Sequence, residues 1–247
     1  MTTTVPPSER TRIRRPGYAA YDAATVFAIL DAGLVCHIAY VVDGAPYVTP
    51  TLYWRDGTRL YWHGSSAGRL FRAAAGPFPV ALAVSHVDAL VLARSAIRHT
   101  MLFRSVVAFG DAALVTDEGE KRRALRRLID RLYPGRWPQL RPMRSEELEA
   151  TAVMAMTIAE ASAKVKRHGV LERREEDHAT PVWAGLIPLA TTIGRAEPDA
   201  RLAVDRALPA SLVDYAEHAA LDRVLSTTAE RQERCDAALP LDPLVRP

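Results

Sequence analysis

The chain has 247 residues, of which 49% are apolar and 25% are charged, so its composition excludes a disordered or fibrous protein. A net charge of +3 is too small to predict nucleic-acid binding by itself. No stretch approaches the roughly 20 apolar residues of a membrane-spanning helix. The two cysteines, Cys36 and Cys235, form no CxxC motif, and no HExxH motif occurs. We therefore expect a soluble, cytoplasmic protein with free thiols and no metal site.

The N-terminal segment, residues 1–17, is polar and contains three prolines, which predicts an extended arm. Its basic cluster consists of Arg10, Arg12, Arg14 and Arg15. A solvated tail is favoured over a specific binding arm. Asp22 is suited to cap a helix over residues 23–31, which Gly33 then ends.

Three strands joined by tight turns follow this helix. Residues 34–42 form a continuous apolar run, and residues 47–55 and 58–62 are rich in aromatic and β-branched side chains. The Asp-Gly pairs at 43–44 and 56–57 predict hairpin turns, the second of type I′. Consecutive tight hairpins require antiparallel neighbours, which excludes a parallel dinucleotide-binding sheet. No GxGxxG or GxxxxGK[ST] motif occurs, in agreement.

Pro50 lies in the middle of the second of these strands. Proline cannot donate a ladder hydrogen bond, so we expect the strand to be open or bulged there, or to lie at an edge. The third strand ends in HGSSAGR, residues 63–69, which supplies an imidazole, two hydroxyls, a guanidinium and unhindered backbone amides. A helix from about Ala67 would direct its amide end to the same point, so a phosphate is the expected ligand. A polar surface loop with a structural histidine is the alternative.

The second half of the chain extends the sheet and adds helices. We expect a strand pair at 80–84 and 89–93, a long strand at 103–116 with a bulge or bend at Gly110, and last strands at 151–158 and 161–166. Helices are expected at 117–133, at 145–149, from 208 onward and at 214–225, and residues 181–188 should dock as an irregular segment. The sum predicts a mainly β fold, a closed antiparallel barrel with flanking helices. The domain division is an arm at 1–17, a barrel domain at 18–192 and a helical extension at 193–247.

Five stretches of the chain, in order, resemble the flavin-binding split-barrel proteins related to pyridoxamine 5'-phosphate oxidase, and among them the nitroimidazole-resistance (Nim) branch. They are YDAATVFAILDAG, PYVTPTLYW, LYWHGSSAGR, VLARSAIRHTMLFRSVVAFG, and EASAKVKRHG followed by PVWAGLIPL. The resemblance covers about residues 12–192. It implies a six-stranded antiparallel split β-barrel and a homodimer with FMN at the dimer interface. FMN is not distinguished from a deazaflavin at this point.

The resemblance also implies which residues hold the flavin. The backbone at Val48, Thr49, Pro50 and Tyr53 would line the ring. The phosphate would be held by His63, Gly64, Ser65, Ser66 and Arg69. Later segments, some of them from the partner subunit, would contribute Arg104, Ser105, Lys164, Arg167 and Trp183. This chain departs from the family at residues 98–103, where RHTMLF replaces the motif His-His-Ser-Met-Asn-Tyr, and this affects the substrate side of the flavin.

The function implied by the resemblance is an NAD(P)H-dependent oxidoreductase that passes two electrons to a small electron-poor substrate, a nitroaromatic or a quinone. Arg104 or Lys164 would stabilise negative charge on the reduced ring. His63, with an ordinary pKa of about 6.5, is the candidate catalytic acid or base, although a neutral hydrogen-bonding role is favoured. The alternative is a flavin-binding or regulatory protein that does not turn over and docks a partner through its C-terminal helices. A nucleic-acid binder is least favoured, because the arginines lack interleaved aromatics.

Overall fold

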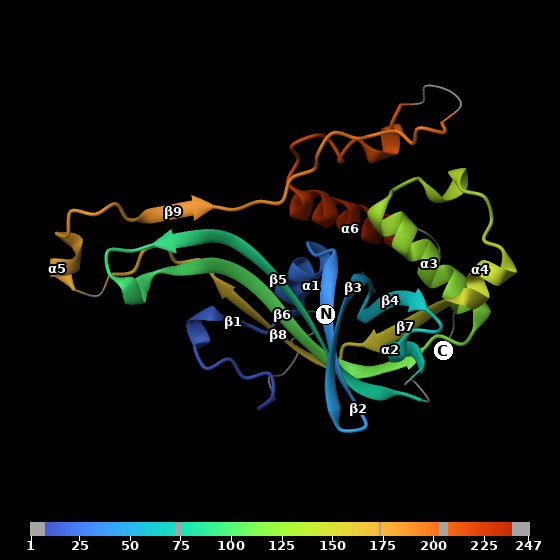
Figure 1. The fold of residues 1–247 in the computed structure, drawn as a ribbon, viewed down its shortest axis with the longest axis horizontal. Helices are drawn as coiled ribbons and strands as arrows, with labels where there is room; N and C mark the ends of the chain where they lie inside the picture. The colour runs from blue at the N-terminus through green and yellow to red at the C-terminus, as the bar shows by residue number, and fades with distance from the viewer. Residues whose placement is uncertain (1–7, 73–75, 173, 203–206, 239–247) are drawn as a thin grey trace.

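An antiparallel β-barrel forms the centre of the computed structural model, which describes residues 8–72, 76–172, 174–202 and 207–238 (Figure 1). The described residues form nine strands: β1 (Ala19–Ala20), β2 (Val35–Val42), β3 (Ala45–Asp56), β4 (Arg59–Ser65), β5 (Phe78–Leu92), β6 (Thr100–Leu114), β7 (Thr151–Thr157), β8 (Glu160–Lys166) and β9 (Gly185–Pro188). Strands β6, β7, β4, β3, β2 and β5 are neighbours in that order, and a further pairing between β5 and β6 joins the ends of the run. These six strands therefore form a ring, which confirms the expected six-stranded antiparallel barrel.

Two apolar clusters hold the barrel and its helices together. Alternation along β2 turns Cys36, Ile38 and Tyr40 inward, where they meet Trp62 and Met154 in the barrel interior. The second cluster lies outside the barrel wall, where strands and helices meet. Its largest members are Trp54, Tyr61, Leu125, Leu128 and Leu225. Where β3 and β4 pair with each other, side chains on both faces are thus buried, one set in the barrel and the other under helices.

Three longer helices surround the barrel. Helix α1 (Ala23–Asp31) begins at its expected cap, because the Asp22 carboxylate accepts a hydrogen bond of 2.8 Å from the Thr25 amide. Helix α3 (Glu118–Leu132) is capped in the same way by Asp117, and α6 (Leu221–Ala238) packs against α3. The short helices are α2 (Arg69–Arg72), α4 (Ser145–Ala150), α5 (Glu175–His178), η1 (Pro16–Tyr18), η2 (Ala96–Arg98), η3 (Trp137–Gln139) and η4 (Ala210–Leu212). Among the described helices, none has both the length and the apolar character needed to cross a lipid bilayer.

Strands β5 and β6 extend together beyond the barrel as a long arm, with β9 paired along β5 and the end of β8 paired along β6 (Figure 1). The expected strand pair at 80–84 and 89–93 is wrong, because β5 is one strand with an irregularity between Val87 and Ala89, and its partner is β6. The irregular segment expected at 181–188 is also corrected, since β9 pairs with Ala89–Leu92 of β5. The helix expected at 214–225 begins only at Leu221, after His218 adopts a positive φ of 69°.

The second turn and the N-terminal arm depart from expectation, and of the alternatives for Pro50 the bulge is excluded. Asp43 and Gly44 both have positive φ, as a type I′ turn requires. In the second turn Gly57 has positive φ, but Asp56 does not, and Asp56 is the last residue of β3. Pro50 causes no bulge, since it stays in register opposite His37. The described part of the arm contacts the barrel but stays largely exposed: Thr11 is buried, and Arg10 pairs with Glu160 and lies over the Phe109 ring at 4.3 Å from its centroid.

Gly110 is required by a close approach of backbone, not by the bulge or bend expected from the sequence. It pairs with Val80 without a register shift, and a Cβ atom there would lie 2.2 Å from the Thr157 carbonyl oxygen. We expect Gly110→Ala to lower the free energy of unfolding by about 2 kcal/mol, because β6 and β7 must move apart. Denaturant unfolding measures this. Gly17→Ala is the control, since nothing lies within 4 Å of a Cβ there; equal midpoints for the two variants would contradict the prediction.

Candidate functional site

The barrel is split between β3 and β4. These strands pair only over Tyr53–Asp56 and Arg59–Trp62, and continuing their register would place Pro50 opposite Ser65, where no pairing occurs. On its other edge β3 is paired with β2, and on its other edge β4 is paired with β7. Among the described residues, the facing edges of both strands therefore have no strand partner from this point on. Backbone groups there can bind a ligand, apart from the Ser65 carbonyl, which accepts a hydrogen bond from the Gly68 amide.

The predicted ring-binding residues lie along the open part of β3. Val48 is 62% exposed, and Pro50 lies on the same outward face, opposite His37 of β2. The Thr49 hydroxyl lies 3.2 Å from the Tyr40 hydroxyl. Tyr53 differs from these, because its side chain is buried in the barrel and its hydroxyl donates to the Leu30 carbonyl. The structure thus brings three of the four residues to one accessible edge and leaves only the backbone of Tyr53 for a ring.

The corner at residues 63–69 offers fewer free amides than expected, and this corrects the predicted phosphate cradle. The amide of Ser66 donates to the Ala150 carbonyl at 3.1 Å, and that of Gly68 donates to the Ser65 carbonyl at 2.8 Å. The amide of Ala67 donates to the Ser65 hydroxyl at 3.3 Å. The exposed hydroxyl of Ser66 remains available to an anion.

Phe71 explains why the corner needs glycine at position 64. A Cβ atom on Gly64 would lie 2.5 Å from the Phe71 ring, so this glycine makes room for packing. Helix α2 begins at Arg69, two residues later than expected, and its described part has four residues, too few to direct a dipole at a ligand. The Arg69 side chain lies outside the described part of the structure.

His63 points away from the barrel interior, into a cavity of about 580 Å³ between β4, α3 and residues 137–143. The walls are mostly apolar and include Leu125, Leu128, Ile129, Trp137, Pro138 and Met143. Arg122 and Arg141 add positive charge, each with one carboxylate partner, Glu118 and Glu147 respectively. The buried Nδ1 atom of His63 has no hydrogen-bond partner among the described residues.

The environment of His63 keeps its imidazole neutral. Burial lowers its pKa below the ordinary value of 6.5, and the ring lies beside Trp54 with centroids 5.9 Å apart. A neutral imidazole with an unpaired nitrogen in an apolar cavity is suited to ligate a metal-containing prosthetic group. This arrangement agrees with a neutral role for His63 better than with acid catalysis.

The lowered pKa of His63 also predicts how stability depends on pH. The unfolded chain binds a proton at His63 below about pH 6.5, while the folded chain does so only at lower pH, so the free energy of unfolding falls as the pH drops through this window. Burial lowers the pKa of His86 in the same direction. Urea unfolding at about pH 7.5 and about pH 5.5 measures the effect. In the His63→Gln variant the free energy of unfolding should decrease less over the same pH range. A pH dependence equal to that of the wild type would contradict the lowered pKa of His63.

Arg104 is tied to carboxylates and is not free to act on a ligand. Its Nη2 donates to Asp88 at 2.7 Å and to Asp222 of α6 at 3.0 Å, and the hydrogen bonds to Asp88 are the first cause that raises its pKa. Ser105 lies opposite Lys164 in the β6–β8 ladder. The Lys164 ammonium lies 5.4 Å from the Phe103 ring centroid. Of the two cations expected to stabilise a reduced ring, Lys164 thus has no carboxylate partner among the described residues.

The remaining predicted residues are dispersed. Arg167 is exposed just after β8, and Trp183 is 65% exposed and rests on Gly185 at the start of β9. Residues 98–103, where the chain departs from the family motif, lie at the far end of the β5–β6 arm. Within one chain these residues therefore do not meet the split between Pro50 and Ser65.

The cavity at His63 was missed by sequence reasoning. Residues 133–138, YPGRWP, had indicated only the end of a helix, and the arginines of 121–131 only a solvated face. The signal was present in the apolar and proline residues that follow, WPQLRPM at 137–143, which form the cavity wall opposite α3. Nothing in the sequence, however, indicates that this segment lies against β4.

The chain is similar to one protein family and to several solved structures. A family model described as pyridoxamine 5'-phosphate oxidase matches residues 22–165. The flavocytochrome Anf3 from Azotobacter vinelandii is 46% identical over 85% of this chain and 98% of its own, with a TM-score of 0.79. An FAD and haem binding protein from Mycobacterium smegmatis is 30% identical over 82% of this chain and 99% of its own, with a TM-score of 0.76.

A more distant structure shares the fold alone. It is assigned to 5-nitroimidazole antibiotic resistance in Bacteroides thetaiotaomicron and is 21% identical over 60% of this chain and 86% of its own, with a TM-score of 0.51. No curated protein matches the chain.

Proposed function

The chain belongs to the pyridoxamine 5'-phosphate oxidase family, and from this premise we propose that it is a flavin-dependent redox protein. The observation that carries the proposal is the split between Pro50 and Ser65, where two unpaired strand edges face each other beside the exposed Ser66 hydroxyl. Two similar solved structures support it, because one is described as a flavocytochrome and the other as a protein that binds FAD and haem.

In this proposal the backbone of Val48, Thr49 and Pro50 binds the flavin ring, and the Ser66 hydroxyl with Arg69 binds its phosphate. FMN is the smallest flavin that satisfies both contacts. Bound flavin supplies two-electron chemistry and bound haem supplies one-electron chemistry. Lys164 stabilises negative charge that develops on the ring, in place of Arg104, whose charge two carboxylates already balance.

We further propose NAD(P)H as the electron donor and a small electron-poor molecule, a nitroaromatic or a quinone, as an acceptor. NAD(P)H loses two electrons and one proton, and a quinone gains two electrons and two protons, the second from solvent. Anaerobic addition of NADPH or NADH to the purified protein tests this step, because the absorbance of oxidised flavin should disappear and return when a quinone is added. Persistent absorbance with both donors would favour a flavin-binding protein without turnover.

A haem in the His63 cavity is the second part of the proposal. The unpaired Nδ1 and the lowered pKa provide a neutral ligand for iron, the apolar walls suit a porphyrin, and Arg122 and Arg141 can approach its carboxylates. His63 would hold the iron, Arg122 and Arg141 would hold the carboxylates, and a bound haem would supply one-electron steps toward an acceptor. Haem is also favoured by the two similar structures, one described as a flavocytochrome and the other as a protein that binds FAD and haem.

A homodimer is proposed from the exposed apolar face of the sheet. Val35, Val41 and Val48 point outward together from β2 and β3, and the β5–β6 arm exposes Leu90 and Met101. Contiguous exposed apolar surface of this kind marks a protein interface. A second copy seated here would place the Pro50 edge at the interface and the arm across its partner.

Val41→Glu tests the dimer without altering the candidate flavin residues. A charge at this exposed β2 position should shift the protein from dimer to monomer at micromolar concentration, since it is desolvated only in the dimer. Light scattering coupled to gel filtration measures the mass. Val213→Glu, at an equally exposed valine far along the chain, is the matched control. A wild-type monomer, or an unchanged mass for Val41→Glu, would contradict the interface.

A further inference from the structure

The N-terminal arm and the edge of β6 and β8 enclose a cavity of about 270 Å³ that gathers four cationic side chains. The cations are Arg14, Arg15, Lys164 and Lys166, and two aromatic residues, Tyr18 and Phe103, complete the walls. Lys164 and Lys166 share one face of β8 because side chains alternate along a strand. No carboxylate lines the cavity among the described residues.

None of these four cations has a carboxylate partner within the described part of the chain. Lys166 donates to the Thr100 hydroxyl at 2.6 Å, and Lys164 lies over the Phe103 ring. Like charges that converge on one cavity repel each other, and an anion between them removes that repulsion. The fixed fork of arginine matches the oxygens of a phosphate in particular.

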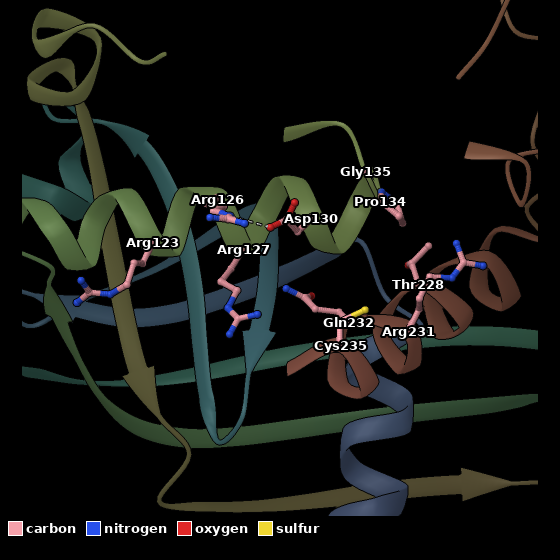
Figure 2. A pocket seen from close by; sticks show the side chains of 10 residues that line it. All are labelled: Arg123, Arg126, Arg127, Asp130, Pro134, Gly135, Thr228, Arg231, Gln232 and Cys235. Carbon is pink, nitrogen blue, oxygen red and sulfur yellow. Dashed lines mark hydrogen bonds and ion pairs between the residues drawn. The ribbon is translucent and has the colours of Figure 1, made fainter. Parts of the chain in front are cut away.

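A larger cleft between α3 and α6, with a volume of about 460 Å³, shows why the arm cavity is the stronger anion site (Figure 2). Its arginines are Arg123, Arg126, Arg127 and Arg231. Three of these have carboxylate partners: Asp130 for Arg126 at 3.2 Å, Asp56 for Arg127 at 3.5 Å, and Asp214 for Arg231 at 2.6 Å. The charge in that cleft is largely balanced within the protein, whereas the charge in the arm cavity is not.

We propose that the arm cavity binds the diphosphate of an adenosine diphosphate moiety. Two bridged phosphates present oxygens to several donors at once, whereas a single carboxylate presents two. The volume is below the roughly 300–1,000 Å³ typical for a whole ligand, so the cavity suits one part of a larger molecule. The rings of Tyr18 and Phe103 provide faces on which the adjoining adenine stacks.

This inference rests on the proposed function, because two of the molecules named there carry this moiety. FAD is a flavin that ends in adenosine diphosphate, and NAD(P)H is a donor that contains it. Binding of the first would make the protein select FAD over FMN, and would place the flavin's phosphate in this cavity and not at Ser66 and Arg69. Binding of the second would make the cavity the donor site.

Arg14→Gln and Arg15→Gln test the cavity, and Arg12→Gln is the matched control. Arg12 lies in the same arm and loses the same charge, but it pairs with Glu9 and does not line the cavity. The flavin released by wild-type protein is identified by mass. Dissociation constants are then measured by calorimetry for ADP with the protein as purified, and for FAD and FMN with protein stripped of flavin.

Two results support the proposal and separate its two sources. If the wild type releases FAD, each cavity variant should bind FAD about tenfold more weakly and FMN more weakly by a smaller factor, because FMN carries one of the two phosphates. If it releases FMN, ADP should bind the purified protein, and each cavity variant should bind ADP about tenfold more weakly. Cavity variants that match Arg12→Gln within about twofold for both FAD and ADP would overturn the proposal. A protein that takes up no flavin contradicts the proposed function, and the ADP titration still decides the cavity.

Discussion

Replacing His63 with alanine is expected to remove haem from the purified protein and to leave its flavin in place. His63 is the histidine that lines the cavity under α3, and its buried Nδ1 has no hydrogen-bond partner among the described residues. Losing the iron ligand should weaken haem binding by more than about a hundredfold, the upper end of the loss seen for residues that only support a ligand. The haem absorbance in the visible spectrum measures the loss, and the flavin content is determined separately.

His99→Ala is the control for this substitution. His99 is exposed near the tip of the β5–β6 arm, where its ring Nδ1 lies 3.2 Å from the Ser95 carbonyl, and it does not line the His63 cavity, so haem content should not change. His63→Gly adds a second test, since free imidazole should enter the space left by the ring and restore haem binding. Full haem content with an unshifted spectrum in His63→Ala would show that the iron has another ligand.

Arg131→Met is expected to lower the free energy of unfolding by about 3 kcal/mol, because a buried network loses its donor. Arg131 of α3 is 4% exposed and forms no ion pair with a carboxylate among the described residues. Its guanidinium donates to the Leu225 carbonyl at 2.5 Å, to the Thr228 hydroxyl at 2.7 Å and to the Asp31 carbonyl. One side chain thus joins α3 to α6 and to the end of α1, and methionine would leave these acceptors buried without it.

The matched control for this prediction is Arg126→Met on the same helix. Arg126 is exposed and pairs with Asp130 one turn away, an interaction that contributes at most about 0.5 kcal/mol. Hydrogen exchange adds a local readout, since α6 should lose protection before the barrel strands do in Arg131→Met. A loss below about 1 kcal/mol, or α6 protection equal to that of the wild type, would contradict the role of Arg131.

The sequence alone predicted the features that depend on residues close together in the chain. Asp22 caps its helix, the Asp-Gly turns separate the expected strands, and tight hairpins enforce an antiparallel barrel. Pro50 correctly marked the place where a strand edge is open, because a residue without an amide hydrogen is tolerated there. The unpaired edges of the split follow from this local chemistry.

Long-range contacts decided what the sequence could not predict. The amide of Ser66 appears free in the sequence, but the carbonyl of Ala150 accepts its hydrogen bond. Arg104 reads as a free cation, but Asp222, far along the chain on α6, is one of its partners. Strand alternation assigns His63 to the same face as Tyr61, while the α3 cavity that covers this face depends on tertiary packing.

The absorption spectrum of the purified protein, with mass identification of whatever is released on denaturation, tests the central claim most directly. We expect the bands of an oxidised flavin and a released flavin in near-equal amount to the chain. A colourless protein that remains colourless after incubation with FMN and FAD would contradict it.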